Sequence, residues 1–123
     1  MKWWAHILGS AFIALALAPR EVATAPVLVA VGAVLPDAVE RMVGARHRSL
    51  HELSIYLILT GPLALAGFAT LAIGAVDHIL TDAMTVHGVT VFGYRLKGPF
   101  NTNVWLHNVA SVLIHFTVAA LLV

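Results

Sequence analysis

The chain has 123 residues, of which 60% are hydrophobic and 11% are charged, and its formal net charge is +1. With a mean hydropathy of +0.92, it is too apolar for an ordinary soluble domain of this length. We therefore expect a single membrane-embedded domain over residues 1–123. The absence of cysteine excludes disulfide scaffolds, thiolate metal sites and cysteine nucleophiles, and the lack of a basic run gives no reason to expect nucleic-acid binding.

Two apolar stretches in the N-terminal half are typical of helices. The first, Trp3 to Ala18, stops at the charged turn Pro19-Arg20-Glu21. It resembles a signal peptide, but proline directly after the small-residue motif argues against cleavage, so we expect a retained helix. The second stretch, Val22 to Leu35, ends at Pro36-Asp37. Both are shorter than the roughly 20 residues that cross a bilayer, so tilt or local thinning would have to compensate.

The uncharged segment from Leu53 to Val76 contains the tripeptide Thr60-Gly61-Pro62. Glycine followed by proline suits a tight turn with a new helix behind it. The sequence therefore predicts a helical hairpin with a turn at Gly61-Pro62, one arm running from about Arg46 to Thr60 and the other from about Leu63 to Met84.

Beyond this hairpin, residues 85–103 are rich in Gly, Thr, Asn and basic residues, as expected of a surface loop, with Val89 to Phe92 as a short extended piece. Val104 to Val123 is a final apolar helix. The predicted fold is an all-α polytopic membrane bundle of about five helices.

Several ionisable side chains come out at one depth if the first four helices run up and down. At about 1.5 Å of rise per residue, His6, Asp37, His47 and His78 lie roughly 18–24 Å from the turn that ends their helix pair. His51 and Asp82 lie one helical turn away from His47 and His78 on the same helix faces. Together these residues form the predicted set of metal ligands: His6, Asp37, His47, His51, His78 and Asp82.

Most basic residues fall on the same side as these histidines, and only Arg20 lies opposite. By the positive-inside tendency this side faces the cytoplasm, as expected of a protein of the plasma (inner) membrane. The basic residues on the histidine side are Lys2, Arg41, Arg46, Arg48, Arg95 and Lys97.

The strongest local signal is His78 with Asp82, an i, i+4 pair on one helix face that can bind an ion or hold one imidazole in place. Taken alone, the pair is as easily explained by structural hydrogen bonds near a helix end. His47 and His51 form a second such pair, which by itself better suits a basic segment at the lipid headgroups. His115 lies at mid-membrane depth, where a neutral, hydrogen-bonded packing role is expected.

Four motifs in chain order resemble the YdjM-like family of predicted membrane-bound metal-dependent hydrolases: His6, Leu35-Pro36-Asp37, His47-Arg48-x-x-His51 and His78-x3-Asp82-x-x-Thr85-x-x-Gly88. The resemblance extends from about His6 to Pro99 and is most specific in Gly74 to Gly88. It implies a helical membrane protein with a His/Asp metal site and hydrolase activity. The chain departs from the family pattern at Val39, where a second acid is common and Glu40 is the nearest carboxylate, and in its His47 motif, which is one residue shorter.

These residues predict metal-assisted hydrolysis at the membrane surface. A bound divalent ion lowers the pKa of its water and polarises the bond under attack. Glu40 or Asp77 would accept the proton of that water, and Arg48 would hold an anionic group of a phospholipid or other amphiphilic phosphoester. Zinc suits a histidine-rich site without sulfur, and manganese or iron suits its carboxylates nearly as well.

Two other functions agree with the same residues. The His/Asp cluster could bind a structural ion or form a metal or proton pathway in a protein that is not an enzyme. The chain could also be a small scaffold whose polar cluster specifies helix packing. In each case membrane lipid is the expected partner, and a homo-oligomer would cover the polar side of short helices.

Overall fold

The structure is a computed structural model that describes residues 1–44 and 52–123, and within these ranges it contains six helices and one β-hairpin. In chain order the elements are α1 (Trp3–Leu17), α2 (Pro19–Thr24), α3 (Pro26–Met42), α4 (Leu53–Leu65), α5 (Ala69–Ala83), β1 (Val89–Val91), β2 (Tyr94–Leu96) and α6 (Trp105–Leu122). The prediction of a mostly helical chain is confirmed. The count of about five helices is exceeded because the expected charged turn at Pro19-Arg20-Glu21 is itself a short helix, α2.

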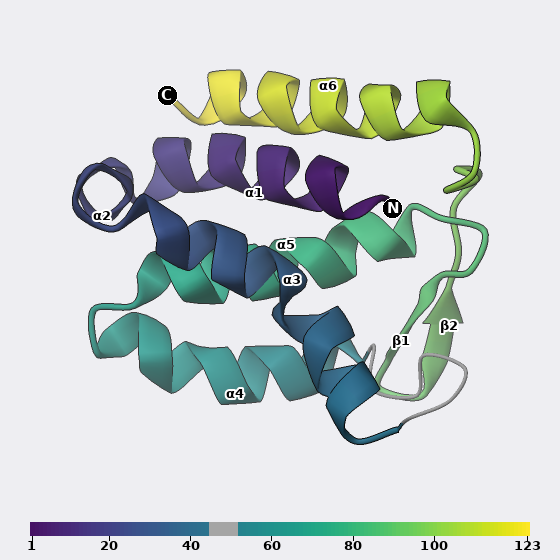
Figure 1. The fold of residues 1–123 in the computed structure, drawn as a ribbon, viewed down its shortest axis with the longest axis horizontal. Helices are drawn as coiled ribbons and strands as arrows, with labels where there is room; N and C mark the ends of the chain where they lie inside the picture. Colours follow the sequence, from purple (N-terminus) through teal and green to yellow (C-terminus); the bar gives the residue numbers. More distant parts are fainter. Residues whose placement is uncertain (45–51) are drawn as a thin grey trace.

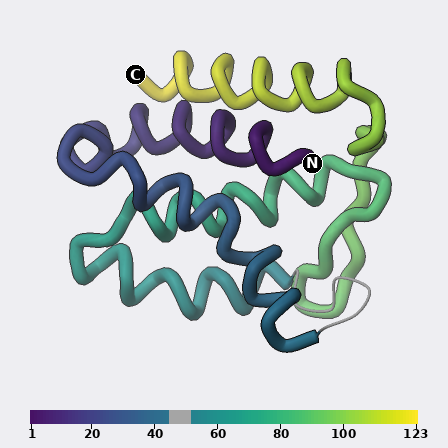
Figure 2. The backbone as a smooth tube through the Cα atoms, in the orientation of Figure 1, coloured from purple at the N-terminus to yellow at the C-terminus, as the bar shows by residue number. Residues whose placement is uncertain are grey.

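The helices α6, α1, α5 and α4 lie side by side in that order, and α3 packs against both α1 and α5 (Figure 1). The β-hairpin closes one end of this bundle and α2 lies at the other end. The N-terminus lies near the hairpin, and the C-terminus lies at the α2 end (Figure 2). The start of α1 and the end of α5 therefore meet at the hairpin end.

Two glycines allow α3 and α5 to approach each other closely. A Cβ atom on Gly32 would collide with the backbone carbonyl of Leu71, and one on Gly74 would collide with the carbonyl of Val29. Small residues at a helix interface let the two backbones come together. This contact brings the second half of α3 beside the last turns of α5.

The predicted helix end at Pro36-Asp37 is wrong, because α3 continues through Pro36 to Met42. Figures 1 and 2 show a bend partway along α3. Proline lacks the N–H that would bond to the carbonyl of Gly32, which accounts for such a bend. Pro36 is fully buried, so packing stabilises the interrupted helix, and Asp37 projects from within it.

The predicted turn at Gly61-Pro62 is also wrong. Both residues lie inside α4, which ends at Leu65. The predicted hairpin of two helices is nevertheless present, with α4 and α5 as its arms, and its second arm begins at Ala69 rather than Leu63. The chain therefore reverses about five residues later than the proline suggested.

Gly67 ends α4 instead. Its φ of +92° is a left-handed conformation that glycine adopts without steric cost. The N–H of Phe68 donates to the carbonyl of Leu63 at 2.9 Å, as in the Schellman motif that commonly terminates helices. A glycine just beyond the last helical residue is thus the stop signal that decided the reversal.

The expected surface loop contains a hairpin in which Val89 pairs with Leu96 and Val91 with Tyr94 in antiparallel register. The extended piece predicted at Val89 to Phe92 corresponds to β1, whereas its partner strand β2 had no counterpart in the prediction. The predicted last helix is confirmed as α6.

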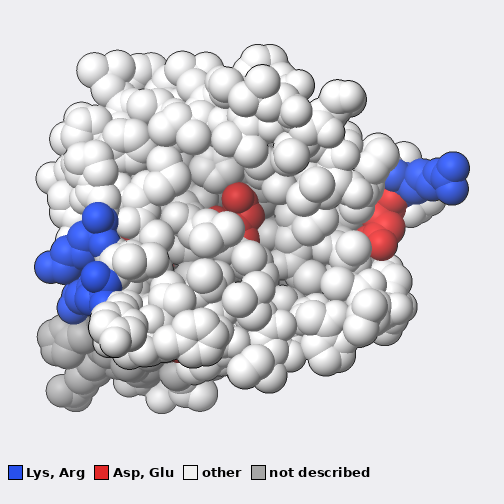
Figure 3. All heavy atoms as spheres, turned by 180° about the vertical axis from the view of Figure 1, so that it is seen from behind, with Lys and Arg blue, Asp and Glu red and all other residues white. Residues whose placement is uncertain are grey.

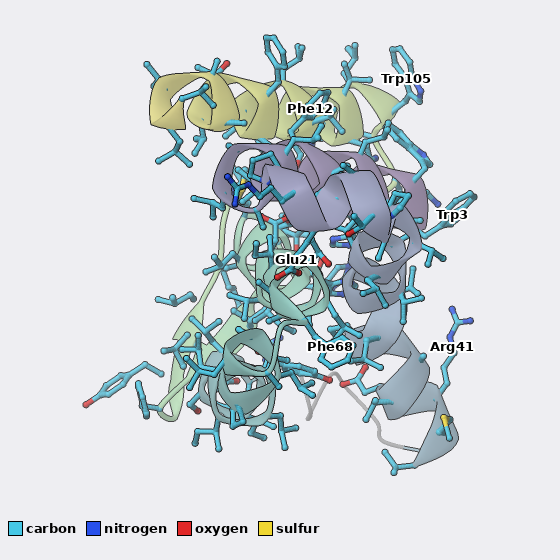
Figure 4. The ribbon with its side chains drawn as sticks, turned by 90° about the vertical axis from the view of Figure 1, so that its left-hand side faces the viewer. Trp3, Phe12, Glu21, Arg41, Phe68 and Trp105 are labelled. Atoms are coloured by element: carbon cyan, nitrogen blue, oxygen red, sulfur yellow. The ribbon has the colours of Figure 1, made fainter. Side chains whose placement is uncertain are left out.

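A carboxylate from α2 stabilises the start of α5. Glu21 accepts the backbone N–H of Thr70 at 2.9 Å, and Figure 4 shows its side chain pointing toward that helix. Negative charge is favourable at a helix N-terminus. Across the bundle, Phe12 of α1 and Phe116 of α6 pack edge to face, with ring centroids 5.3 Å apart.

Among the described residues, only α6 is both long and apolar enough to cross a bilayer by itself. The helices α1 and α4 are apolar but shorter. Many large hydrophobic side chains are exposed on the outer faces of α4 and α6.

Candidate metal centre

Three buried side chains converge at the hairpin end of the bundle. His6 comes from α1, and His78 and Asp82 come from consecutive turns of α5. Each offers one ligand atom, and these atoms all lie within 4.8 Å of one another. The i, i+4 spacing puts His78 and Asp82 on one face of α5, and the packing of α1 across that face adds His6. This group can hold a metal ion.

The Asp82 carboxylate lies between the two imidazoles. Its Oδ1 is 3.4 Å from Nε2 of His6, and its Oδ2 is 3.5 Å from Nε2 of His78. Asp37 of α3 adds a carboxylate oxygen 3.6 Å from the same nitrogen of His78. The two imidazole rings are stacked, with centroids 3.8 Å apart.

The group is compact enough to share an ion, because the ligand atoms of His6, His78 and Asp82 all lie within 4.8 Å of one another. The two imidazoles face different oxygens of the Asp82 carboxylate. Imidazole nitrogen and carboxylate oxygen are also donor types that zinc, manganese and iron accept.

A backbone carbonyl prepares His78 for this role. Its Nδ1 lies 2.5 Å from the carbonyl oxygen of Ala33. A carbonyl only accepts hydrogen bonds, so Nδ1 carries the proton and Nε2 carries the lone pair. An imidazole nitrogen that carries its lone pair is the form that metal binding requires.

The group opens into a polar pocket of about 220 Å³ at the end of the bundle. The pocket is lined by Met1, Asp37, Glu40, Asp82, His87 and Thr102. The α-amino group of Met1 also donates to Asp82 Oδ1 at 2.7 Å. The structure thus brings four predicted ligands, His6, Asp37, His78 and Asp82, to one place and puts the proposed proton acceptor Glu40 in the adjoining pocket.

Three predicted site residues lie outside the described residues. They are the ligand candidates His47 and His51 and the anion-binding candidate Arg48. Their roles stay predictions.

Asp77, the other predicted proton acceptor, directly precedes His78 on α5 but belongs to a second buried group. Its Oδ2 accepts the hydroxyl of Ser10 at 2.7 Å, and its Oδ1 lies 3.2 Å from Nε2 of His115. That nitrogen is also 2.9 Å from the hydroxyl of Thr81, and Nδ1 of His115 is 2.6 Å from the carbonyl of Ser111. Consecutive helix residues point about 100° apart, so Asp77 faces α1 and α6 instead of the metal group.

The expectation of a hydrogen-bonded packing role for His115 agrees with this arrangement, since the side chain is buried and bonded at both ring nitrogens. The expected neutral charge of its imidazole stays a prediction. The sequence did not reveal its partners Ser10 and Thr81. The one local signal is Ser111, which precedes His115 by a single helical turn. His107 has a loop role, because its Nδ1 accepts the N–H of Asn101 at 2.8 Å.

A larger pocket of about 340 Å³ lies between α1, α4 and α5. Its lining is apolar apart from Asp77 and Thr60, and it includes none of His6, His78 and Asp82. Figure 3 shows acidic side-chain atoms within a hollow on the rear face of the molecule. Because the polar pocket and not this one adjoins the ligand atoms, we assign the chemistry to the polar pocket.

Comparison of the chain with models of known protein families, with characterised proteins and with solved structures finds no match. The resemblance to the YdjM-like family stays a prediction that rests on the motifs quoted above.

Proposed function

We propose that the chain is a membrane-embedded metal-dependent hydrolase that acts at the membrane surface on a phospholipid or another amphiphilic phosphoester. The observation that carries this proposal is the buried convergence of His6, His78 and Asp82, whose ligand atoms lie within 4.8 Å of one another. Zinc is the ion that best suits two imidazoles and a carboxylate without sulfur.

Several residues of the chain would have separate roles around such an ion. When bound, a divalent ion supplies a Lewis acid and lowers the pKa of a coordinated water. Asp37 provides a further carboxylate beside His78, and Glu40 lines the pocket where a proton from that water would be accepted. Arg48 remains our candidate for holding an anionic group of the substrate.

The membrane location is supported by the apolar surface of the bundle. The helix α6 is long enough to span a bilayer, and α1 and α4 are apolar. We infer a polytopic arrangement in the plasma (inner) membrane in which the hairpin end, with the metal group, lies at the cytoplasmic interface, because most basic residues are at that end. The motif resemblance to membrane-bound hydrolases agrees with this inference.

Metal analysis of the detergent-purified chain tests the proposal directly. Wild type should hold about one equivalent of metal, and H78A and D82A should lose it, because each removes a ligand. H107A is the matched control, since this histidine lies in the first turn of α6 and bonds to the loop at Asn101 instead of belonging to the metal group. Less than about a tenth of an equivalent in wild type would contradict a metal centre.

Activity separates the enzyme from other metal proteins. Metal-loaded wild type should release phosphate or fatty acid from a panel of lipids, and D82A should not. If D82A loses the metal that wild type holds, but neither protein releases any product, the metal centre is supported and the hydrolase is contradicted.

A second candidate function is a metal or proton pathway without hydrolysis. It is favoured by the buried polar series Ser10, Asp77, Thr81 and His115, which continues inward from the metal group. Intramembrane ionisable residues mark transport routes as readily as catalysis. Metal flux into liposomes that depends on Asp77, in the absence of product from the lipid panel, would favour this function.

A further inference from the structure

The turn of the β-hairpin has an unusual residue at its tip. Phe92 has a φ of +48° and Gly93 a φ of +82°, which is the pattern of a type I′ turn with both central residues left-handed. Asparagine, aspartate or glycine normally occupies the first of these positions. A bulky aromatic residue there is a steric outlier, and the backbone conformation does not account for the choice of phenylalanine at this site.

A carboxylate holds this tip in place. Glu52 Oε1 accepts the backbone N–H of Phe92 at 2.8 Å and the hydroxyl of Ser54 at 2.6 Å. The hydrogen bond from Ser54 is the main cause that lowers the pKa of Glu52, which keeps it ionised at neutral pH. The anchor binds the backbone of the tip and leaves the aromatic ring outside, where 76% of Phe92 is exposed.

The outer face of the hairpin combines aromatic and basic side chains. Tyr94 is 78% exposed, and Arg95 and Lys97 are exposed beside it. Every residue of β2 is exposed, whereas Val89 of β1 packs against the core. The described part of this segment therefore carries two positive charges and no acidic residue between Tyr94 and Lys97.

Other aromatic side chains are exposed at the same end of the bundle. Trp3 and Trp105 begin α1 and α6 at this end, each is 67% exposed, and Figure 4 shows both pointing outward on the side away from the hairpin strands. Figure 3 shows basic atoms gathered at one end of the molecule, whereas at the opposite end basic atoms lie directly beside acidic ones. In the described ranges the hairpin end also holds acidic side chains, Glu52 at the tip and Asp37, Glu40 and Asp82 around the polar pocket. The positive charge therefore belongs to the outer face of β2 and the residue after it, Arg95 and Lys97.

We propose that the β1–β2 hairpin is an interfacial anchor that contacts anionic lipid headgroups. Aromatic rings favour the level of the headgroups, and basic side chains near the membrane are attracted to anionic lipid. This inference rests on the proposed membrane location of the chain but not on metal binding or hydrolysis. It would hold the mouth of the polar pocket at the headgroup level of an anionic leaflet.

The chain has no cysteine, so one introduced cysteine can carry a unique spin label. In vesicles of mixed anionic and zwitterionic lipid, a label at Y94C should be reached by lipid-soluble oxygen and shielded from a water-soluble nickel complex. The matched control is T24C, an exposed polar position at the end of α2 and at the opposite end of the bundle, whose label should stay open to the nickel complex.

Two variants combined with Y94C separate anchoring from folding. F92N should keep the hairpin, because asparagine suits a type I′ turn, and yet expose the label to nickel. The double change R95Q/K97Q should lower the ratio of molecules whose label contacts lipid to molecules whose label faces water, by about fivefold for each charge removed. The control R20Q, at the other end of the bundle, should leave this ratio unchanged.

Three results would overturn the proposal: a label at position 94 as open to nickel as the control, identical results in purely zwitterionic vesicles, or failure of the chain to enter vesicles. A label shielded from both oxygen and nickel would also overturn it and would indicate a protein contact, such as a second copy. Metal content measured on the same samples shows independently whether the proposed metal centre survives.

Discussion

Two buried groups along α5, one around His78 and Asp82 and the other around Asp77 and His115, contain the same residue types but have different roles. In both, a backbone carbonyl fixes the Nδ1 proton, that of Ala33 for His78 and that of Ser111 for His115. The Nε2 of His115 is 3.2 Å from Asp77, a distance typical of a direct hydrogen bond. The Nε2 of His78 instead faces two carboxylates at 3.5 and 3.6 Å. Residue type does not separate the two groups: the group of His78 could hold an ion because a third buried ligand, His6, converges on it.

The largest loss of stability is expected when the buried pair of Asp77 and His115 is broken. H115A would leave Asp77 buried without its imidazole, and loss of one member of a buried pair costs about 3–5 kcal/mol. The free energy of unfolding in detergent should fall by that amount, while the metal content stays unchanged.

A double variant, D77L/H115L, sharpens this test. Removing both polar groups should restore most of the lost stability, because no buried charge is left alone. A loss below about 1 kcal/mol in H115A would mean that the pair contributes no more than an exposed one.

Zinc should stabilise the folded chain by binding to the group of His6, His78 and Asp82, and not to the group of Asp77 and His115. At a free concentration of about 100 times its Kd, a ligand that binds only the folded chain adds about 2.7 kcal/mol to the free energy of unfolding. Wild type and H115A should both show this increase in a thermal unfolding assay, and D82N should not. Equal increases in H115A and D82N would contradict the distinction between the two groups.

The contact between α3 and α5 positions a carboxylate beside the metal group. G74A would force the two helices apart, since its Cβ has no room against the carbonyl of Val29, and overpacking costs about 1–3 kcal/mol. Because this shift moves Asp37 away from His78, zinc affinity should fall about 10–100-fold, as when a supporting ligand is lost. Zinc titration followed by calorimetry measures this change, and unaltered affinity would show that Asp37 plays no part.

The smallest effects test the reversal that brings α5 back beside α1. Gly61 lies inside α4 with no atom near its missing Cβ, so G61A should stabilise the chain by about 0.5–1 kcal/mol. G67A should have the opposite sign, because its left-handed φ of +92° strains any residue with a Cβ. If G61A instead destabilised the chain, this result would support the turn predicted at Gly61-Pro62.

Depth counted along the helices was a sound guide to part of the metal group. His78 and Asp82 share a helix face by their spacing alone, and the pairing with His6 and Asp37 followed from helices that run up and down. The guide failed for Asp77, because depth says nothing about direction around a helix. Neighbours differ by about 100°, so Asp77 and His78 point to different partners.

Two prolines were wrongly predicted to end helices, and the glycine that ends α4 was not predicted to do so. Pro36 and Pro62 both lie within helices, where packing of neighbouring helices offsets the lost hydrogen bond. Gly67, which has a positive φ, ended the helix instead. A proline penalty is local and moderate, so tertiary contacts can override it, whereas no packing removes the strain of a left-handed residue that has a Cβ.

The sequence by itself determined the helical character of the chain, the apolar surface, and the shared face of His78 and Asp82, because these follow from composition and from the period of one helix. Only the tertiary structure decided that His6 stacks on His78, that Asp77 pairs with His115, and where the chain reverses. These contacts depend on how closely separate helices pack and how each is rotated about its axis. Gly32 and Gly74 control that packing between α3 and α5, and no local pattern records which helix will lie against them.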